Sequence, residues 1–539
     1  MLGLMMDTQL MISSLLKYAA TNHASKGVVS VETSGDIVRF TYPQLEKRAR
    51  KLATWLVELG VKPGTRVGTI AWNTHRHLEL YYAISGIGAV CHTINPRLAL
   101  DDINYILDDA DTQILFFDDS FSGLISHLIL ADTPVHTFVE MKPGAATTAN
   151  SSDILDYEIG LTGADEMDEW PVFEENRAAG LCFTSGTTGK PKGVLYSHRS
   201  SVLHAMACIA PNVLDVVESD IIMPVVPMFH VNAWGIPHIA PMAGADIIMP
   251  GAGMDGESLA NLIVQENVTF AAGVPTIWHG LISHLQKNNI RLTTMNRCIV
   301  GGSALPETMV RYFEDEQNIP IYQGWGMTET SPICTISKLA RADEYIPRNE
   351  QINKKTRQGQ AVFPIEMKIE TDEKILLPWD NNSSGELYVK GPWVCKTYHN
   401  HGEQQILEDG WFATGDIAKI DPSGSMKITD RAKDIIKSGG EWISSIELED
   451  IAMSHEGVEQ AAVIGVDDER WGERPVMIYV QNKTAPASTE SLEEYLSGKL
   501  PKWQVPREYK IISSLPLGAT GKVLKTSLRE MFGGGETTT

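Results

Sequence analysis

Hydrophobic and polar residues follow two alternating patterns along the first 300 positions. Residues 42–60, YPQLEKRARKLATWLVELG, carry apolar side chains at helical spacing and end on glycine, which predicts an amphipathic helix. Short apolar runs predict buried strands at 66–72, 112–119, 220–227, 245–250 and 297–302. Further helical patterns are found at 78–90, 256–267 and 277–288. This alternation predicts layered α/β subdomains with largely parallel sheets.

The pattern changes near residue 359, where alternating strands such as 385–391 and 426–430 predict a β-rich subdomain over about 359–430. A compact final unit follows, with a helix at 445–455 and strands at 460–466 and 475–481. We therefore expect an N-terminal domain (1–432) joined by a hinge in the polar segment 429–434 to a small, mobile α+β C-terminal domain (433–539). The tail GGGETTT is predicted to be disordered.

Composition narrows the class of protein. The chain has 539 residues, 43% of them apolar, and a net charge of −23, which argues against nucleic acid as a partner. An anionic ligand must then be held by local lysines, backbone N–H groups or a bound cation. The six cysteines form no C-x-x-C pair, and no run of eighteen apolar residues occurs. We expect a cytoplasmic protein with buried thiols, no cysteine-based metal site and no membrane span.

Residues 181–198, LCFTSGTTGKPKGVLYSH, are rich in hydroxyls, glycines and cations. They do not fit the Walker phosphate loop, because Gly186 and Gly189 are only three apart and Pro191 follows Lys190. A polyphosphate can still be bound here by another arrangement. A solvated turn between two strands is the alternative that this segment alone leaves open.

Further motifs follow this segment in a specific order. They are PMFHVNAWG (227–235), GGSALP (301–306), YQGWGMTETSP (322–332), GWFATGDI (410–417), DRAKDIIKSGGEWISSIELE (430–449), LPKWQVP (500–506) and LPLGATGKVLK (515–525). The series resembles the adenylate-forming (ANL) superfamily over roughly residues 30–530. Within it, the chain is similar to medium- and long-chain acyl-CoA synthetases and to 3-methylmercaptopropionyl-CoA ligases. Two departures are Trp325, where many relatives carry tyrosine, and Ala413, where many carry arginine.

The resemblance implies an AMP-forming acid–thiol ligase. A carboxylic acid and ATP would give acyl-AMP and pyrophosphate, and the CoA thiol would then displace AMP. Because two anions must be brought together, positioning and electrostatic stabilisation would supply most of the rate. The implied cofactors are ATP, Mg²⁺ and CoA, and the implied assembly is a homodimer.

The resemblance also implies the nucleotide site. Glu329 and Thr184 would coordinate Mg²⁺, although Glu329 alone could equally be a helix-capping carboxylate on the surface. Asp416 would accept the ribose hydroxyls, with an Asx turn as its structural alternative, and Trp325 would stack on adenine. The residues implied for ATP and AMP are Thr184, Ser185, Gly186, Thr187, Thr188, Lys190, Gly302, Gln323, Gly324, Trp325, Thr328, Asp416, Arg431, Lys433 and Lys437, with Lys192 nearby.

Three further groups of residues follow from the resemblance. Lys522 would neutralise charge on the carboxylate and α-phosphate during adenylation, and Lys433 would be the hinge about which the C-terminal domain rotates between the two steps. The implied catalytic residues are Lys522, Glu329, Thr328 and His230; the acyl pocket would be lined by Val231, Trp234 and Pro332; CoA would meet Gly439, Gly440, Glu441, Trp442 and Glu473.

Two rival functions stay open at this point. One is an adenylating enzyme with a different acceptor, such as a carrier protein or oxygen. The other is a catalytically silent protein that binds acyl groups or nucleotides, against which the presence of Glu329, Asp416 and Lys522 argues. The acid itself is also open, since 3-methylmercaptopropionate and short, medium-chain or long fatty acids all fit the motifs.

Overall fold

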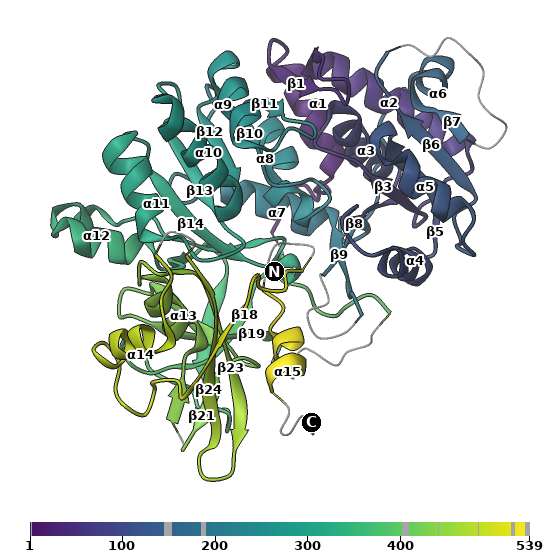
Figure 1. Cartoon of the computed structure of the whole chain (residues 1–539). Helices are drawn as coiled ribbons and strands as arrows, with labels where there is room; N and C mark the ends of the chain where they lie inside the picture. The colour runs from purple at the N-terminus through teal and green to yellow at the C-terminus, as the bar shows by residue number, and fades with distance from the viewer. Residues whose placement is uncertain are drawn as a thin grey trace. The chain divides into compact units, whose positions relative to one another are not determined.

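Figure 1 shows the computed structural model of the chain. The structure describes residue 1 and residues 3–144, 154–184, 190–400, 409–439, 441–482, 485–518 and 523–533. Internal contacts divide the chain into two compact units. Unit 1 comprises Met1–Thr184, Pro191–Glu366 and Lys390–Phe412; unit 2 comprises Ser185–Lys190, Met367–Val389 and Ala413–Thr539.

Unit 1 contains two large sheets and the helices that cover them. Its strands are β1 Gly27–Val31, β2 Ile37–Thr41, β3 Arg66–Ile70, β4 Val90–Thr93, β5 Thr112–Asp118, β6 Thr137–Met141, β7 Ile154–Asp156, β8 Ala178–Phe183, β9 Gly193–Ser197, β10 Ile221–Pro224, β11 Asp246–Met249, β12 Phe270–Gly273, β13 Arg297–Val300, β14 Ile321–Gly326, β15 Ile333–Ile336 and β16 Gln360–Ala361. Its helices are α1 Ile12–Asn22, α2 Tyr42–Glu58, α3 His75–Gly86, α4 Leu100–Asp109, α5 Ser122–Ile129, α6 Tyr157–Gly163, α7 His198–Cys208, α8 Ile236–Ala243, α9 Gly256–Gln265, α10 Pro275–Asn288, α11 Glu307–Arg311 and α12 Arg348–Lys355. Short turns are η1 Asp119–Phe121, η2 Val231–Gly235, η3 Tyr312–Glu316, η4 Thr328–Thr330 and η5 Arg341–Tyr345.

The strand orders of unit 1 confirm the predicted α/β class. One sheet runs β16-β15-β14-β13-β12-β10-β11-β1-β2 and the other β7-β6-β5-β3-β4-β8-β9. Central neighbours pair in parallel, as β12 does with β13 and β3 with β5, whereas β9 closes its sheet antiparallel to β8. Parallel sheets need apolar cover on both faces, which explains their nearly continuous apolar strands.

Helix α2 illustrates how local sequence sets these elements. Thr41 and Gln44 form a capping box at its start, and Pro43 occupies the first turn, where a missing N–H costs nothing. Its apolar face, which includes Leu45 and Leu52, is fully buried. The predicted helix at 42–60 is therefore confirmed to within two residues.

The helix predicted over 78–90 is wrong at both ends. α3 begins at His75 and ends at Gly86, and residues 90–93 form the buried strand β4 instead. Gly88 has φ +77°, a left-handed conformation that glycine adopts without strain and that turns the chain into the strand. The pattern alone did not reveal this break, because helix and strand are both apolar here.

Unit 2 holds two smaller sheets with helices. Its elements are β17 Glu366–Glu370, β18 Gly385–Lys390, β19 Phe412–Ile420, β20 Met426–Arg431, β21 Ile436–Ser438, β22 Glu441–Ile443, α13 Ser445–Met453, β23 Val458–Asp468, β24 Gly472–Gln481, α14 Thr489–Ser497, β25 Glu508–Ile511 and α15 Lys525–Phe532. One sheet runs β17-β18-β19-β20, and the other runs β22-β21-β24-β23 with β25 beside β24. The predicted β-rich and α+β regions are both present. The domain boundary at 433 stays a prediction.

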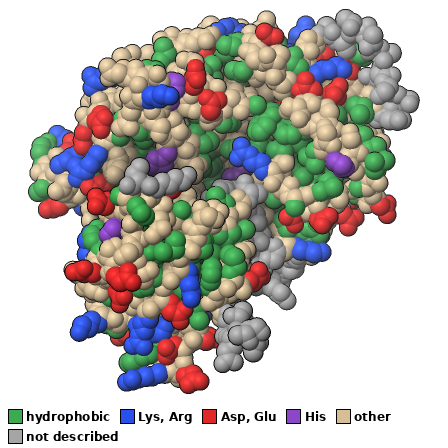
Figure 2. All heavy atoms as spheres, viewed as in Figure 1, with side chains coloured by type: hydrophobic (Ala, Val, Ile, Leu, Met, Phe, Trp, Pro, Cys, Tyr) green, Lys and Arg blue, Asp and Glu red, His purple; other side chains and the backbone are tan. Residues whose placement is uncertain are grey.

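The described residues hold no helix that is long and apolar enough to cross a membrane. The cysteines are free thiols, and all except Cys395 are buried, as predicted. On the face drawn in Figure 2, Lys and Arg side chains are scattered among Asp and Glu.

Candidate active site

The segment 184–192 joins two antiparallel strands. Phe183 of β8 pairs with Gly193 of β9, and the next residues are closed by two hydrogen bonds. The Thr184 N–H donates to the Lys192 carbonyl at 2.9 Å, and the Lys192 N–H donates to Thr184 Oγ1 at 3.2 Å. Ser185, Gly186, Thr187 and Thr188, predicted to hold phosphates, lie outside the described residues, as do Gly440 and Lys522. The loop is thus held at its base by paired strands, unlike a Walker loop, which leads into a helix.

Glu329 lies in the turn η4, and its position excludes the reading as a surface carboxylate. The residue is only 6% exposed. The Tyr398 hydroxyl donates a hydrogen bond to Glu329 Oε1, and the Tyr196 hydroxyl donates to the Thr328 carbonyl at 2.7 Å. Burial, with the Glu329 charge as a second cause, raises the pKa of Tyr398, so this phenol remains a donor.

Tyr398 also connects Glu329 to the phosphate-loop segment. The Lys192 ammonium lies 5.0 Å from the centre of the Tyr398 ring, within the range of a cation–π contact. A cation of the segment 184–192 and the carboxylate of the MTET turn thus meet at one tyrosine. Tyr398 lies outside the sequence motifs; the polar segment KTYHN at 396–400, between apolar stretches, is a weak signal that could have suggested it.

The residues predicted for adenine lie just after β13 and within β14. Gln323 is buried, and its side-chain carbonyl accepts a hydrogen bond from the Leu305 N–H at 3.1 Å, which holds the GGSALP loop. Gly302 has φ +80°, so a side chain there would be strained. Trp325 points to the same face of β14 as Gln323, and its indole is 9% exposed. The stacking role of Trp325 stays a prediction.

The segment predicted to contact the acyl group has a strained backbone. Val231, Asn232, Ala233 and Trp234 have φ of 47°, 52°, 46° and 57°, and Gly235 continues with φ 80°. Such conformations cost about 1–2 kcal/mol for each L-residue, and a β-branched residue such as Val231 rarely adopts them. A left-handed turn of this length persists only where surrounding contacts hold it.

Two anchors of that turn come from neighbouring elements. Asn232 Oδ1 accepts from the Tyr81 hydroxyl at 3.2 Å and lies 3.5 Å from the Cys182 thiol. The Trp234 indole packs on the adenine loop so closely that a Cβ at Gly301 would lie 2.8 Å from it. The turn therefore places Trp234, a predicted acyl-wall residue, directly against the predicted nucleotide loop. Tyr81 and Cys182 were not predicted as part of this site.

His204 of α7 contacts both the turn η2 and the start of β15. Its Nε2 accepts a hydrogen bond from the Ile333 N–H at 3.3 Å, next to the predicted wall residue Pro332. A Cβ at Gly235 would lie 2.9 Å from its ring. Burial, with His238 as a second cause, lowers the pKa of His204 to about 3, which agrees with a neutral ring that accepts at Nε2. His230, the predicted catalytic histidine, immediately precedes the turn η2 and is half-buried.

Unit 2 pairs the two residues predicted for the ribose. Asp416 of β19 and Arg431 of β20 lie opposite each other in an antiparallel ladder. The Arg431 Nε lies 2.9 Å from Asp416 Oδ1, and the Asp416 side chain is only 2% exposed. The Asp416 N–H donates to Thr414 Oγ1 at 3.1 Å. The guanidinium orients the carboxylate, whose oxygens can accept hydrogen bonds from hydroxyl groups.

The hairpin β21–β22 collects the residues predicted for the second step. Lys437 lies opposite Trp442, and its ammonium is 5.7 Å from that ring and 2.9 Å from Asp372. Glu473 accepts from the Lys437 N–H at 2.7 Å, so this carboxylate supports the hairpin backbone. Gly439 has φ +64°, and a Cβ there would lie 2.8 Å from the Trp471 ring. Glu441 is exposed. Burial lowers the pKa of Lys433, which lies between β20 and β21.

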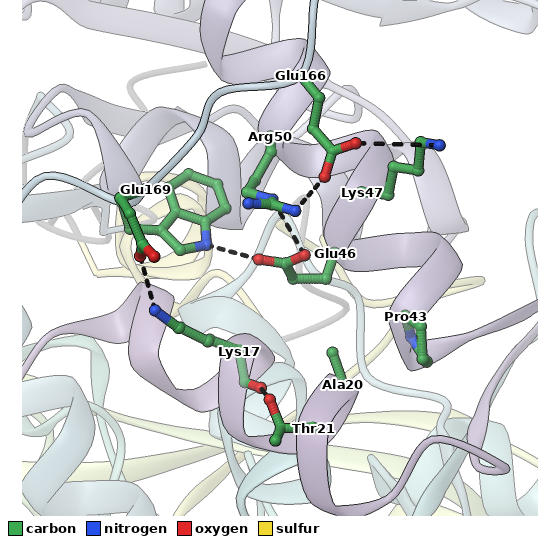
Figure 3. A pocket seen from close by; sticks show the side chains of 10 residues that line it. Lys17, Ala20, Thr21, Pro43, Glu46, Lys47, Arg50, Glu166 and Glu169 are labelled. Carbon is green, nitrogen blue, oxygen red and sulfur yellow. Dashed lines mark hydrogen bonds and ion pairs between the residues drawn. The ribbon is translucent and has the colours of Figure 1, made fainter.

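Two pockets in unit 1 are lined by none of the predicted site residues. One, of about 1120 Å³, is lined by Tyr322, Lys338 and Lys355 among others. The other, of about 340 Å³, lies beside α1 and α2 and is shown in Figure 3. There Arg50 binds Glu166 and, at 3.1 Å, Glu46, so the charges neutralise one another and act as structural links.

Few side chains in the described part of the chain are placed to bind a metal ion. The described residues contain no group of three or more His, Cys, Asp or Glu side chains placed to hold a metal ion. A buried carboxylate flanked by hydroxyls, as Glu329 is by Thr328 and Thr330, can still supply one ligand to Mg²⁺. Mg²⁺ commonly takes its remaining ligands from substrate phosphates and water, so the residues present fit this ion.

Comparison with known protein families gives two matches. The model of the AMP-binding enzymes matches residues 16–399, and the model of the AMP-binding enzyme C-terminal domain matches residues 447–522. The first match includes the phosphate-loop segment and Glu329, and the second ends at Lys522; residues 400–446, which include Asp416 and Lys433, lie between the two.

Individual relatives are similar over nearly the whole chain. A 3-methylmercaptopropionyl-CoA ligase of Ruegeria lacuscaerulensis is 46% identical over 99% of both chains. A medium-chain-fatty-acid–CoA ligase of Ectopseudomonas oleovorans is 45% identical over 99% of this chain and 98% of its own. Among solved structures, the anthranilate CoA ligase AuaEII in complex with anthranoyl-AMP has a TM-score of 0.84 at 22% identity, with 98% of each chain covered. A fatty acyl CoA synthetase of Mycobacterium tuberculosis has a TM-score of 0.71 at 28% identity, with 97% of this chain and 98% of its own covered.

Proposed function

This chain belongs to the family of AMP-binding enzymes, and from that premise we propose that it is an AMP-forming acyl-CoA ligase that activates a carboxylic acid as acyl-AMP and transfers it to CoA. The observation that carries the proposal is the meeting of Lys192 and Glu329 at Tyr398. ATP, Mg²⁺ and CoA are the cofactors of this activity.

The first half-reaction is assigned to residues of the phosphate-loop segment, the turn η4 and their neighbours. Thr184, Lys190 and Lys192 flank the loop that holds the β- and γ-phosphates. Glu329 supplies a carboxylate to Mg²⁺, and the ion contributes charge neutralisation between the phosphates when it is bound. Tyr398 keeps the Glu329 carboxylate oriented through its hydroxyl. His230 and Thr328 flank the substrate carboxylate in this proposal.

The second half-reaction is assigned to the hairpin β21–β22. After rotation about Lys433, the segment 437–442 replaces Lys522 at the adenylate. Gly439 and Gly440 permit close approach of the pantetheine arm, since neither carries a side chain. Trp442, Glu441 and Glu473 form its surroundings.

We propose 3-methylmercaptopropionate or a short- to medium-chain fatty acid as the substrate. The relatives that are 46% and 45% identical act on these two classes of acid, according to their names. Trp234 packs against Gly301, which favours a pocket closed by an indole over a long open channel. A homodimer is a further proposal that rests on the resemblance alone, and a cytoplasmic location is one that rests on the composition of the chain.

The test measures pyrophosphate release from ATP with a panel of acids, with and without CoA, and detects the thioester by mass. We expect pyrophosphate in both cases and the thioester only with CoA. The kcat/KM profile against acids of increasing length, with 3-methylmercaptopropionate included, identifies the substrate class. Absence of pyrophosphate with every acid contradicts the proposed activity, and a product without CoA favours another acceptor.

A further inference from the structure

Hydrogen bonds cross the proposed hinge at Lys433. Asp430 precedes the hinge, and its carboxylate accepts from the Ser445 N–H at 2.5 Å and from the Ser445 hydroxyl at 2.9 Å. The Ser444 hydroxyl donates to the carbonyl of Thr429. These contacts join the last residues of β20 to the first turn of α13, within unit 2.

The Asp430 carboxylate occupies a buried, electrostatically favourable position. The side chain is fully buried at the N-terminus of α13, where unpaired N–H groups and the helix dipole favour negative charge. Burial raises the pKa of Asp430, and the Lys525 charge and the Ser445 donors oppose that shift. Each partner would have to be replaced by water if Asp430 and Ser445 separated.

Lys525 extends the contact to the segment that carries Lys522. Its ammonium donates to Ser445 Oγ at 2.7 Å and binds Glu449 at 2.6 Å. Lys525 begins α15, three positions after Lys522 in the sequence. The helix that follows the proposed catalytic lysine is therefore tied, through Ser445, to a strand on the other side of the hinge.

A second residue of α15 binds the hinge itself. Arg529, one turn after Lys525, donates to the Lys433 carbonyl at 3.2 Å and binds the Asp434 carboxylate at 2.7 Å. Asp434 and Arg529 both follow Lys433, so this pair can move with the C-terminal part. The contacts of Asp430 and Thr429 with Ser444 and Ser445 join one side of the hinge to the other, as the ion pair of Lys437 with Asp372 also does.

We propose that Asp430 is a positioning residue whose contact with Ser445 and Lys525 holds the C-terminal part in one of its two catalytic poses. The inference rests on the proposed two-step activity with rotation about Lys433. Rotation moves Ser445 and Lys525 relative to Asp430, so the three side chains, named here the Asp430 latch, are together in one pose only. Opening the latch exposes a buried carboxylate and a helix N-terminus to water.

The experiment measures the two half-reactions separately in the full chain. Adenylation is followed as pyrophosphate release from octanoate or 3-methylmercaptopropionate with ATP, and thioester formation is followed from the corresponding preformed acyl-AMP with CoA. Asp430→Asn keeps the side-chain shape but removes the charge. We expect it to change the ratio of the two rates at least tenfold, because the step that uses the latched pose slows while the other does not.

Two further variants keep the test decisive. Ser445→Ala deletes one hydroxyl and leaves the backbone contact, so we expect a smaller change of the ratio in the same direction. Asp421→Asn is the matched control, since Asp421 caps the β19–β20 turn through Ser423 and Ser425, all before the hinge. This control should keep the ratio within twofold of the wild type.

The proposed role of Asp430 is wrong if both half-reactions slow equally in Asp430→Asn and Ser445→Ala. It is also wrong if neither variant changes the rate of either half-reaction. Far-UV circular dichroism and urea midpoints identify a variant that fails to fold, and Ser445→Ala then decides alone. A wild-type chain that forms neither acyl-AMP nor thioester contradicts the proposed function instead, so the two failures are distinguishable.

Discussion

The two units each contain a buried network of charged side chains, but the networks connect different kinds of elements. In unit 1, Arg48 binds Glu79 at 2.6 Å and Glu158 at 3.0 Å, and Arg76 joins Glu158 to Glu32. In unit 2, Asp430, Ser445, Lys525 and Glu449 form the second network.

The unit 1 network joins elements that also share an extensive apolar core. α2 packs along α3, and their apolar faces are buried together with the ion pairs. The unit 2 network instead joins residues before and after Lys433. Similar ion pairs and hydrogen bonds thus stabilise a fixed scaffold in unit 1, whereas we propose that those of unit 2 form a reversible contact, because only they lie across the predicted axis of rotation.

The largest effect on a reaction rate is expected from a substitution in the C-terminal part, which is predicted to rotate. Lys522→Ala should lower pyrophosphate release by about 10²–10⁴-fold, typical for the loss of a key electrostatic group in a transition state. Thioester formation from preformed acyl-AMP should be nearly unchanged, since the proposed rotation would remove Lys522 from the site in that step. Equal losses in both half-reactions, measured in stopped assays, would contradict the assignment.

A substitution in the unit 1 network should lower the free energy of unfolding and leave the ratio of the two half-reaction rates unchanged. Glu79→Gln removes a fully buried carboxylate and leaves Arg48 partly uncompensated, which costs about 3–5 kcal/mol of unfolding free energy. Urea unfolding followed by tryptophan fluorescence measures the loss. If Glu79→Gln changed the ratio of half-reactions as Asp430→Asn does, the distinction between the two networks would be wrong.

The hinge variant separates the two steps directly. Lys433→Pro fixes φ at about −65° and so restricts the rotation. We expect adenylation to stay within a few-fold of the wild type and thioester formation to fall by about 10²-fold, as for other steps that depend on precise positioning. Full-speed thioester formation by this variant would refute the hinge.

Acid should destabilise unit 1 in particular, because it holds 14 of the 15 histidines of the sequence. Burial lowers the pKa of His204 and of His198 to about 3 in the folded chain. As the pH falls below the ordinary value of about 6.5, the unfolded state binds these protons first, so stability present above pH 6.5 is lost, by about 2 kcal/mol per histidine at pH 5.

His204→Gln tests the size of this pH effect. Glutamine can still accept from the Ile333 N–H but does not titrate. The average slope of unfolding free energy between pH 6.5 and pH 5 should therefore decrease by about 1.1 kcal/mol per pH unit relative to the wild type. An unchanged slope in urea titrations at several pH values would show that His204 is not a buried neutral base.

Much of the fold could be read from the chain because its signals are local. The period of apolar positions and the capping box of α2 depend on neighbours within a few residues. The exception, the helix expected over 78–90, fails where α3 and β4 are both apolar and only the break at Gly88 separates them. The order of motifs from 181 to 525 likewise needed no structure, since it is a property of the linear sequence.

The sequence by itself determined the class of fold, the family and most of the candidate residues. The tertiary structure decided which groups meet: Tyr398 with Glu329, His204 with Ile333, Asn232 with Tyr81, and Asp430 with Ser445. These partners are separated by 15 to 151 positions, and no local pattern specifies such distances. They come together because packed sheets and helices place distant backbone segments side by side, where burial makes every polar group require a partner.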